Sequence, residues 1–554
     1  MNFRKGLTAL LFTILLSVTC LAQDVTFNHV VGSNPNSAEV RIQIKAARRV
    51  YQPIIARTFV KPPVVADWNV SIGALGVSAR GQGDYTAQWN DSMQGLSTPS
   101  CTADYSIVPI NVTPSATQAN IVLFNQLYRG PSPGGICGTG TPATLAAYQL
   151  GTTGTLGSPT LAVNGTKFAI LERGNATLHI VTIGTGGGTV TAPILPGASD
   201  VSLDYTNLVT ANCTAGTVHH ANSSDVWVDY SRDEAYVGDD AGRIYLITGA
   251  FKGTPTLSFC TQVGSGASAK IGLPEHINVS GTDYVYFINN GQTIRRTQVN
   301  ATRTGFTSNI TRTLSSVTGR IVDGSIIDTG SGFIYVWTNN DATGANAALY
   351  QLNFGLVIQA ELNIGPVTTQ PYYNGYFDNT YFVSGATASG ATGYTCGYPN
   401  GTLGGPKLYS FQFSNTTGVM NTSFLLNGDA NIANGTLVNG NSCAPLLSVF
   451  DSVAGVDQLF VGTGNGTTTN NSKLSRWDIT TPFSLISTTP TNSVTGIPGG
   501  TSAILIDWEP SNLGAETQNI YFVNTATPTA ARCGGASAPF PSCETKLQQA
   551  GLNN

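Results

Sequence analysis

After about residue 100, the chain repeats one pattern eight times. A short apolar run ends in Asp or Asn, a turn follows, and a second apolar run rich in Tyr, Phe and Val comes next. The clearest copy is residues 224–248, with the sequence SDVWVDYSRDEAYVGDDAGRIYLIT. Repetition at this spacing in a β pattern is typical of units arranged around an axis or stacked in a line. The repeat therefore predicts an architecture, but it does not by itself predict an activity.

The spacing of the repeat corresponds to one four-stranded antiparallel sheet with its loops. The residue that ends the first run recurs at Asn111, Asn164, Asp229, Asn278, Asp328, Asp378, Asp451 and Asp507. Such sheets bury both faces when they pack around an axis. We therefore predict an all-β fold, a β-propeller of eight blades, with seven as the alternative. A recurring carboxylate suggests catalysis, but we expect these side chains to cap their own turns instead.

The two ends of the chain are expected to close the ring together. The last copy supplies strands near residues 502–507, 519–523 and 546–552 and then ends. A fourth strand is expected from the stretch ADWNVSIGALGVSARGQGDYTAQWN, which we interpret as a hairpin around Trp68 and Trp89. The predicted domains are thus a propeller over 64–554 and a small β extension or strap over 23–63.

The first 22 residues read as a signal peptide. Arg4 and Lys5 precede an apolar run, and small residues end at Ala22. We expect an exported protein, located in the periplasm, at the cell surface or outside the cell, with no transmembrane anchor. The chain carries 26 Lys and Arg against 30 Asp and Glu. This mild acidity argues against nucleic acid as a partner.

Eight cysteines remain after cleavage, an even number that suggests disulfides in an exported chain. Sequence does not determine their connectivity. Their order along the chain favours four local pairs, and we expect Cys101–Cys137, Cys213–Cys260, Cys396–Cys443 and Cys533–Cys543. No pair has zinc-ligand spacing, so no metal is predicted at the cysteines.

Part of the best copy resembles a known type of repeat. Residues 234–249, EAYVGDDAGRIYLITG, are similar to the repeat of quinoprotein-type propellers, with a YVG run, a turn and a final strand. Longer stretches, including TQANIVLFNQLYRGPSPGGICGTG, are similar to uncharacterised exported bacterial proteins. The first resemblance implies the fold alone, and the second brings no known activity. The tryptophan-docking repeats of pyrroloquinoline quinone dehydrogenases are missing from the sequence, so we predict no cofactor.

Other enzyme classes lack their sequence motifs as well. The chain has neither a G-x-S-x-G elbow nor an H-E-x-x-H pair. The acidic turns with Asp239 and Asp240, and with Asp429, Asn431 and Asn434, supply oxygen ligands of the kind that Ca²⁺ takes. Solvated turns are the preferred interpretation. A pair of distant carboxylates acting on a carbohydrate stays open as the alternative.

We therefore predict a binding or scaffold protein for an extracellular or envelope partner, a protein or a glycan. The alternatives are a secreted enzyme acting on carbohydrate, as a hydrolase or lyase, and a quinoprotein-type dehydrogenase. Long connections around 131–140, 208–222, 386–406, 463–472 and 525–545 are expected on one face of the ring. His219 and His220 lie in one of them, although exposed loop histidines need no function. Tyr394 and Tyr398, which flank Cys396, are candidate contact residues. The alternative for both tyrosines is that they cover a small core of their own loop.

Overall fold

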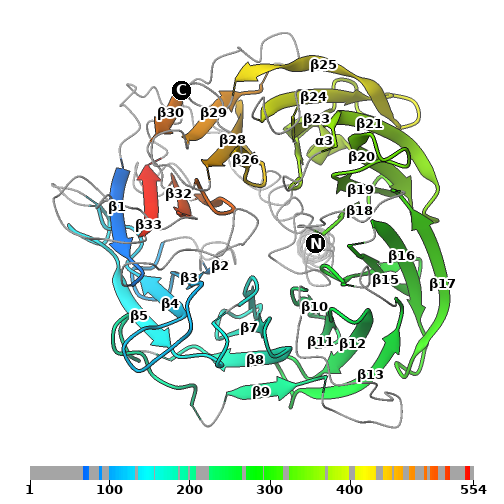
Figure 1. The fold of residues 1–554 in the computed structure, drawn as a ribbon. Helices are drawn as coiled ribbons and strands as arrows, with labels where there is room; N and C mark the ends of the chain where they lie inside the picture. Colours follow the sequence, from blue (N-terminus) through cyan, green and yellow to red (C-terminus); the bar gives the residue numbers. More distant parts are fainter. Residues whose placement is uncertain are drawn as a thin grey trace, which may run out of the picture.

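The computed structural model places eight antiparallel sheets around a central axis, so the chain is an eight-bladed β-propeller (Figure 1). The predicted fold class and the blade count of eight are confirmed. Seven sheets have four strands and one has five. The structure describes residues 66–73, 87–89, 99–130, 135–154, 156–184, 187–197, 200–206, 224–264, 270–290, 292–315, 324–367, 372–398, 406–431, 441–451, 455–465, 473–480, 492–495, 500–508, 518–524 and 543–548.

The blades are numbered in chain order. Blade 1 contains β2 (Ala87–Trp89), β3 (Tyr105–Pro109), β4 (Ile121–Asn125) and β5 (Ala143–Tyr148). Blade 2 contains β6 (Thr160–Leu161), β7 (Lys167–Glu172), β8 (Thr177–Thr182) and β9 (Val201–Asp204). Blade 3 contains β10 (Trp227–Asp229), β11 (Glu234–Gly238), β12 (Arg243–Thr248) and β13 (Thr256–Gln262). Blade 4 contains β14 (Glu275–Val279), β15 (Thr282–Ile288), β16 (Thr293–Val299) and β17 (Phe306–Thr313).

The second half of the ring continues in the same way. Blade 5 contains β18 (Ile326–Asp328), β19 (Phe333–Thr338), β20 (Asn346–Asn353) and β21 (Ile358–Pro366). Blade 6 contains β22 (Tyr376–Phe377), β23 (Thr392–Gly397), β24 (Lys407–Phe413) and β25 (Met420–Asn431), with the short helix α3 (Asn379–Ser384) after β22. Blade 7 contains β26 (Asn441–Cys443), β27 (Leu447–Asp451), β28 (Val456–Asn465), β29 (Lys473–Asp478) and β30 (Asn492–Thr495).

Blade 8 is shared between the two ends of the chain. It contains β31 (Leu505–Trp508), β32 (Gln518–Val523) and β33 (Cys543–Gln548), and its fourth strand is β1 (Ala66–Ser71). β1 pairs antiparallel with β33, from Ala66 opposite Leu547 to Ser71 opposite Cys543. Opening the ring here would break a whole ladder of hydrogen bonds. The predicted hairpin around Trp68 and Trp89 is wrong, because β1 and β2 lie in different sheets.

Seven of the eight recurring Asp and Asn residues lie within three residues of the end of the strand that precedes the first turn of a blade, as the pattern predicts. Asn111 does not, because it follows β3, the second strand of blade 1. The side chains cap turns: Asp229 Oδ1 accepts from the backbone N–H of Ser231 at 2.9 Å, and Asp328 Oδ1 accepts from Gly330 N at 2.9 Å. The interpretation as turn caps therefore holds at these positions.

Large aromatic side chains fill the spaces between neighbouring blades. Trp227 lies opposite Tyr236 in blade 3, and both are fully buried. Tyr236 stacks on His276 of blade 4 with 5.1 Å between ring centroids, and Tyr245 meets Tyr205 edge-on at 4.8 Å. Burying each large ring stabilises the folded chain by roughly 2–3 kcal/mol. The core is therefore a ring of inter-blade layers rather than one central cluster.

Antiparallel pairing assigns every connection to one of two faces. Connections from first to second and from third to fourth strands lie on one face, which we call the a–b face. Those from second to third strands, and those between blades, lie on the opposite b–c face. No helix among the described residues is long and apolar enough to span a membrane.

Candidate functional site

We predicted that five long connections lie on one face of the ring, and the structure supports only part of this prediction. Residues 131–140 join β4 to β5, so this connection is on the a–b face and not with the others. The prediction is wrong here because the copy of the repeat in blade 1 corresponds to its second and third strands, β3 and β4, and not to its first and second. Residues 386–406 are not one loop, because they contain strand β23. The predicted loops 208–222, 463–472 and 525–545 lie largely outside the described residues, as do His219 and His220.

Tyr394 and Tyr398 are core residues and not surface contacts, each with 1% of its area exposed. Tyr394 lies in β23, the second strand of blade 6, opposite Tyr376 and Ser410. The Tyr398 ring meets the Tyr372 ring edge-on at 5.0 Å. Burial raises the pKa of both phenols. The prediction that these rings meet a partner is therefore corrected, and the alternative of a covered core fits their burial.

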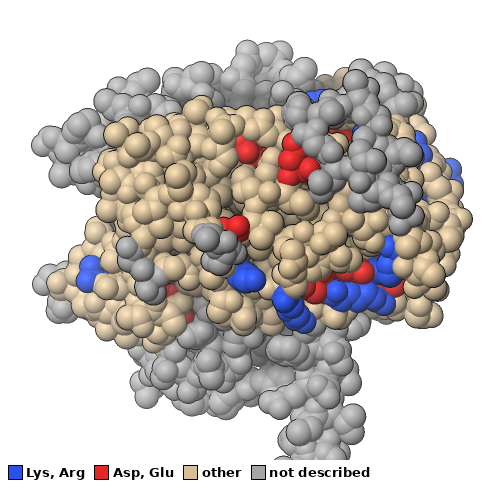
Figure 2. Space-filling model, turned by 90° about the horizontal axis from the view of Figure 1, so that it is seen from below, with Lys and Arg blue, Asp and Glu red and all other residues tan. Residues whose placement is uncertain are grey.

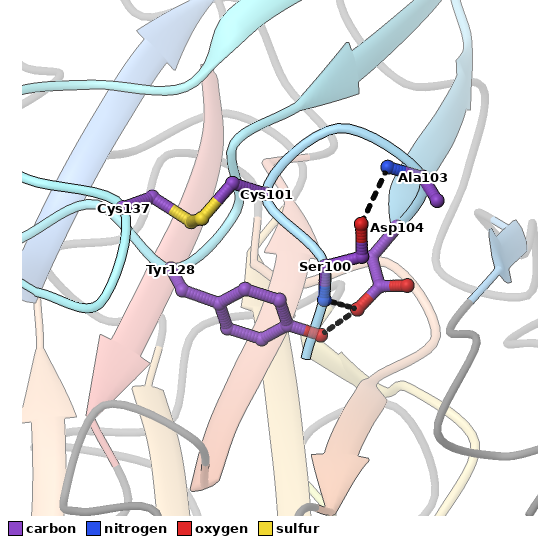
Figure 3. Close-up of a disulfide and its surroundings, with 6 residues drawn as sticks. All are labelled: Ser100, Cys101, Ala103, Asp104, Tyr128 and Cys137. Atoms are coloured by element: carbon purple, nitrogen blue, oxygen red, sulfur yellow. Dashed lines mark hydrogen bonds between the residues drawn. A yellow bond between two sulfur atoms is a disulfide. The ribbon is translucent and has the colours of Figure 1, made fainter. Parts of the chain in front are cut away.

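Two of the predicted disulfides are present. Cys101 and Cys137 join the β2–β3 and β4–β5 connections, both on the a–b face of blade 1, with 5.6 Å between their Cα atoms (Figure 3). Asp104 orders the same turn, because its Oδ2 accepts from Ser100 N at 2.9 Å and from the Tyr128 hydroxyl at 2.7 Å. The bridge thus fixes one end of blade 1.

The second disulfide connects neighbouring blades. Cys396 in β23 of blade 6 bonds to Cys443 in β26 of blade 7, across a sequence separation of 47. Cys260 and Cys543 are also disulfide-bonded, and their partners lie outside the described residues. Cys213 and Cys533 lie outside as well, so the other two predicted pairs stay predictions. All six described cysteines are oxidised, which fits a non-cytoplasmic protein.

Among the described residues, the largest group of linked charged side chains lies between blades 3 and 4, on the a–b face. We call it the inter-blade cluster, and it consists of Asp229, Arg232, Glu234, Tyr236, His276, Asp283 and Arg303. Asp229, Arg232 and Glu234 come from the β10–β11 turn and its ends. His276 and Asp283 come from β14 and β15, and Arg303 from the β16–β17 turn. The tight turns of two blades therefore bring together groups up to 69 residues apart in sequence.

Arg303 and His276 link the carboxylates of the cluster. Arg303 donates from Nε to Glu234 Oε1 at 2.9 Å and from Nη1 to Asp283 Oδ2 at 2.6 Å. His276 Nε2 lies 3.2 Å from Asp283 Oδ1, and its Nδ1 lies 3.5 Å from Asp229 Oδ2. Arg232 adds contacts to both aspartates, at 2.9 and 3.0 Å. Each carboxylate therefore has a cationic neighbour.

The electrostatics around Asp283 favour its ionised form. Burial opposes ionisation of Asp283, but His276, Asn278 and the nearby Arg232 hold its pKa well below its usual range. Removing one partner would leave a buried, uncompensated charge, which is strongly destabilising. The arrangement is therefore an ionic cross-link between blades 3 and 4. A carboxylate held in this way is a poor proton donor near neutral pH.

A smaller buried pair holds the outer part of blade 2. Glu172 Oε1 accepts from the backbone N–H groups of Thr152 and Thr153, both at 2.7 Å. His179 Nε2 lies 3.3 Å from Glu172 Oε2, and its Nδ1 lies 2.8 Å from the Ser202 hydroxyl. Burial alone would raise the pKa of Glu172, but these hydrogen bonds lower it to about 2. The pair orders the β5–β6 connection.

In the acidic turn at Asp239 and Asp240, both carboxylates bind groups of the protein itself. Asp239 Oδ1 accepts from Ala241 N and Arg243 N at 2.9 and 2.8 Å, and its Oδ2 accepts from the Tyr245 hydroxyl. Asp240 pairs with Lys270 at 2.9 Å. Asp429 and Asn431 lie in β25, and Asn434 is outside the described residues. Among the described residues, no three His, Cys, Asp or Glu side chains are grouped for a metal.

Charge is sparse on the outer surface seen in Figure 2: Lys and Arg side chains lie beside Asp and Glu at the lower right of the view, and the other charged side chains are scattered singly or in small groups. This distribution matches a chain with only 10% charged residues. It gives no extended field of one sign on that side, which the steering of a polyanion would need.

No protein-family model matches the chain, and no curated protein matches it. Solved structures of similar fold include Sqt1 from Saccharomyces cerevisiae, with a TM-score of 0.44, 11% identity, and coverage of 88% of this chain and 98% of that one. The Dos1 propeller has a TM-score of 0.42, 9% identity, and coverage of 87% and 94%. A europium-containing methanol dehydrogenase has a TM-score of 0.38, 8% identity, and coverage of 72% and 92%. Similarity this distant carries no argument about activity.

Proposed function

We propose that the protein is an exported binding protein. In this proposal the rigid ring presents the connections of the b–c face to a protein or glycan partner in the cell envelope or outside the cell. A signal peptide over residues 1–22 would direct export, and the oxidised cysteines support an oxidising compartment. The proposal concerns recognition, with an enzyme acting on carbohydrate as the competing outcome.

The length of the connections on the b–c face carries the proposal. Among the described strands, the two largest sequence gaps between consecutive strands are residues 205–226 and 524–542, and the strand ends that flank each gap lie on that face. Each contains a cysteine, Cys213 or Cys533. On the a–b face the connections of blades 3 to 5 are short, such as residues 230–233 between β10 and β11, although residues 183–200 between β8 and β9 form a long one. Long, cysteine-bearing connections on a rigid scaffold are the usual place for recognition.

The scaffold itself supports this role. β1 closes blade 8, a disulfide joins blades 6 and 7, and the inter-blade cluster joins blades 3 and 4. These contacts hold the blades in fixed relative positions, so the strand ends that bear the connections of one face keep their spacing. A preorganised surface loses less entropy on binding than a flexible one.

The test uses the mature chain, residues 23–554, on glycan arrays and against envelope extracts, with chromogenic glycosides assayed in parallel. Replacing residues 466–472 or 525–531 with glycine and serine should reduce binding at least tenfold while leaving the fold intact. The matched control replaces residues 415–417, an exposed turn on the a–b face, and should bind as the original chain does. Substrate turnover that is lost on mutating one acidic residue, without saturable binding, would refute the proposal.

A further inference from the structure

The outermost strand of blade 4 is unusually open to solvent. β17 has seven exposed residues out of eight. The equivalent strands β13 and β21 have buried residues at alternate positions, as expected where one face packs against a neighbouring blade. β17 is also the last strand of its sheet, so its outer edge pairs with no strand among the described residues. An open edge of this kind is a template for pairing with another chain.

Three arginines lie on β17 and on the neighbouring strand β16. None of them has a carboxylate within ion-pair distance among the described residues. Arg295 donates to the Thr311 hydroxyl at 3.3 Å, and Arg296 donates to the Phe354 carbonyl at 2.8 Å. Arg312 donates to the Leu356 carbonyl at 3.0 Å. By contrast, Arg173, Arg232, Arg303 and Lys270 each lie within 3 Å of a carboxylate oxygen. Blade 4 therefore carries a local excess of positive charge.

The strand register distributes these charges over both faces of the sheet. Arg296 is opposite Ile310, and Arg312 is opposite Ile294, so Arg296 and Arg312 share one face. Arg295 is opposite Thr311 on the other face. Two apolar side chains lie beside the arginine pair: Ile310 is 36% exposed, and Val357, next to Leu356, is 48% exposed. The edge therefore offers backbone groups, cations and apolar contacts together.

We propose that the β17 edge binds an extended acidic peptide segment of a partner protein, which adds to blade 4 as a fifth strand. Backbone pairing along β17 would supply affinity, and alternate side chains would set specificity. Carboxylates on the added strand would pair with Arg312 and Arg296 on one face or with Arg295 on the other. A glycan has no alternating N–H and C=O groups, so it could use the arginines but not the edge. This surface lies on the outer rim of the ring, separate from the b–c face (Figure 1).

The experiment uses the full mature chain and a capped ten-residue peptide that alternates valine with glutamate. We expect saturable binding by fluorescence anisotropy, weakening as salt is added, and slowed amide exchange in residues 306–313. The same peptide with lysine in place of glutamate should not bind. A peptide that keeps the glutamates but has proline in place of valine should not bind either, because proline cannot donate to a ladder.

Substitutions on the protein separate the edge from general charge effects. Arg312→Glu should weaken peptide binding at least tenfold, and Arg295→Glu should weaken it to a lesser extent. Lys252→Glu makes the same change of charge on an exposed turn of blade 3 and should leave binding unchanged. Equal binding of the proline peptide, unchanged exchange in β17, or no binding at low salt would each overturn the proposal. Because the probe is a peptide and the readout is β17, failure here leaves the test of the b–c face unaffected.

Discussion

Glu544 makes stability depend on pH in a direction opposite to that of most carboxylates. It lies in β33 between Val70 of β1 and Val523 of β32, in the blade that closes the ring, and its side chain is fully buried. Burial raises the pKa of Glu544 to about 8, and the Ser106 hydroxyl of blade 1 only partly offsets this. The carboxyl is therefore protonated in the folded protein at neutral pH.

The size of the effect follows from the difference between folded and unfolded states. The unfolded carboxyl has a pKa of 4.5, so between pH 4.5 and 8 the folded state holds a proton that the unfolded state has lost. Stability therefore falls as pH rises through this window. Each unit of difference between the folded and unfolded pKa changes the free energy of unfolding by about 1.4 kcal/mol. The loss is about 3 kcal/mol at pH 7 and about 5 kcal/mol above pH 8.

Glu544→Gln isolates this contribution, because glutamine has nearly the same size and does not ionise. Unfolding in guanidinium, followed by tryptophan fluorescence with disulfides intact, should give similar stabilities for both proteins at pH 4.5. The variant should become more stable than the original chain by about 3 kcal/mol at pH 7. A difference that stays constant from pH 4.5 to 8.5 would refute the reasoning, since it would mean that Glu544 is ionised in the folded protein.

Three further predictions concern other parts of the ring. Replacing Cys396 and Cys443 with serine should lower the unfolding free energy by roughly 2–4 kcal/mol in non-reducing buffer, and an unchanged denaturation midpoint would contradict a stabilising bridge. Trp227→Ala should cost roughly 3–5 kcal/mol, because it empties a fully buried position, and Trp227→Phe should cost less when measured by the same unfolding assay. The pKa of Glu172 is lowered to about 2, so its contribution of about 3 kcal/mol is present above pH 4.5 and is lost as pH falls towards 2. Glu172→Gln should remove that acid dependence, and equal acid profiles for the two proteins would argue against the Glu172–His179 pair.

The fold could be predicted because its determinants are local. Each blade begins with an apolar strand and an Asp or Asn turn cap, which a single sequence reveals at seven of the eight positions. Blade 1 differs because residues 90–104 form a long connection between its first strand, β2, and the second strand, β3. Because no second apolar run follows β2 closely, the sequence pattern matches β3 and β4 instead, and Asn111 lies one strand too late. That shift also placed residues 131–140 on the wrong face.

The prediction that Tyr394 and Tyr398 contact a partner is wrong because glycine occurs both in turns and in closely packed strands. The stretch around Cys396 reads as a loop, yet Gly393 and Gly397 are in strand β23. A Cβ atom on Gly393 would lie 2.1 Å from the Phe411 ring, and one on Gly397 would lie 2.2 Å from the Ile364 carbonyl. These glycines allow close packing within the core, which sequence alone does not distinguish from a turn.

No short sequence motif indicates the inter-blade cluster. Glu234 and Arg303 are 69 residues apart, and they meet only because blades 3 and 4 are neighbours in the ring. His276 ends up between two aspartates because β10, β14 and β15 lie side by side there. Predicting such contacts requires knowing which residues of neighbouring blades lie at the same level. The spacing of the repeat gives that alignment only to within a few residues.

Hydrogen exchange of the mature chain, alone and with a ligand recovered from the glycan array or envelope extract, tests the proposed function most directly. The account predicts slowed exchange in residues 205–226 and 524–542, with little change in the a–b turns at 230–233 and 329–332. Protection confined to the a–b face would contradict it. So would a failure of every array and extract component to bind.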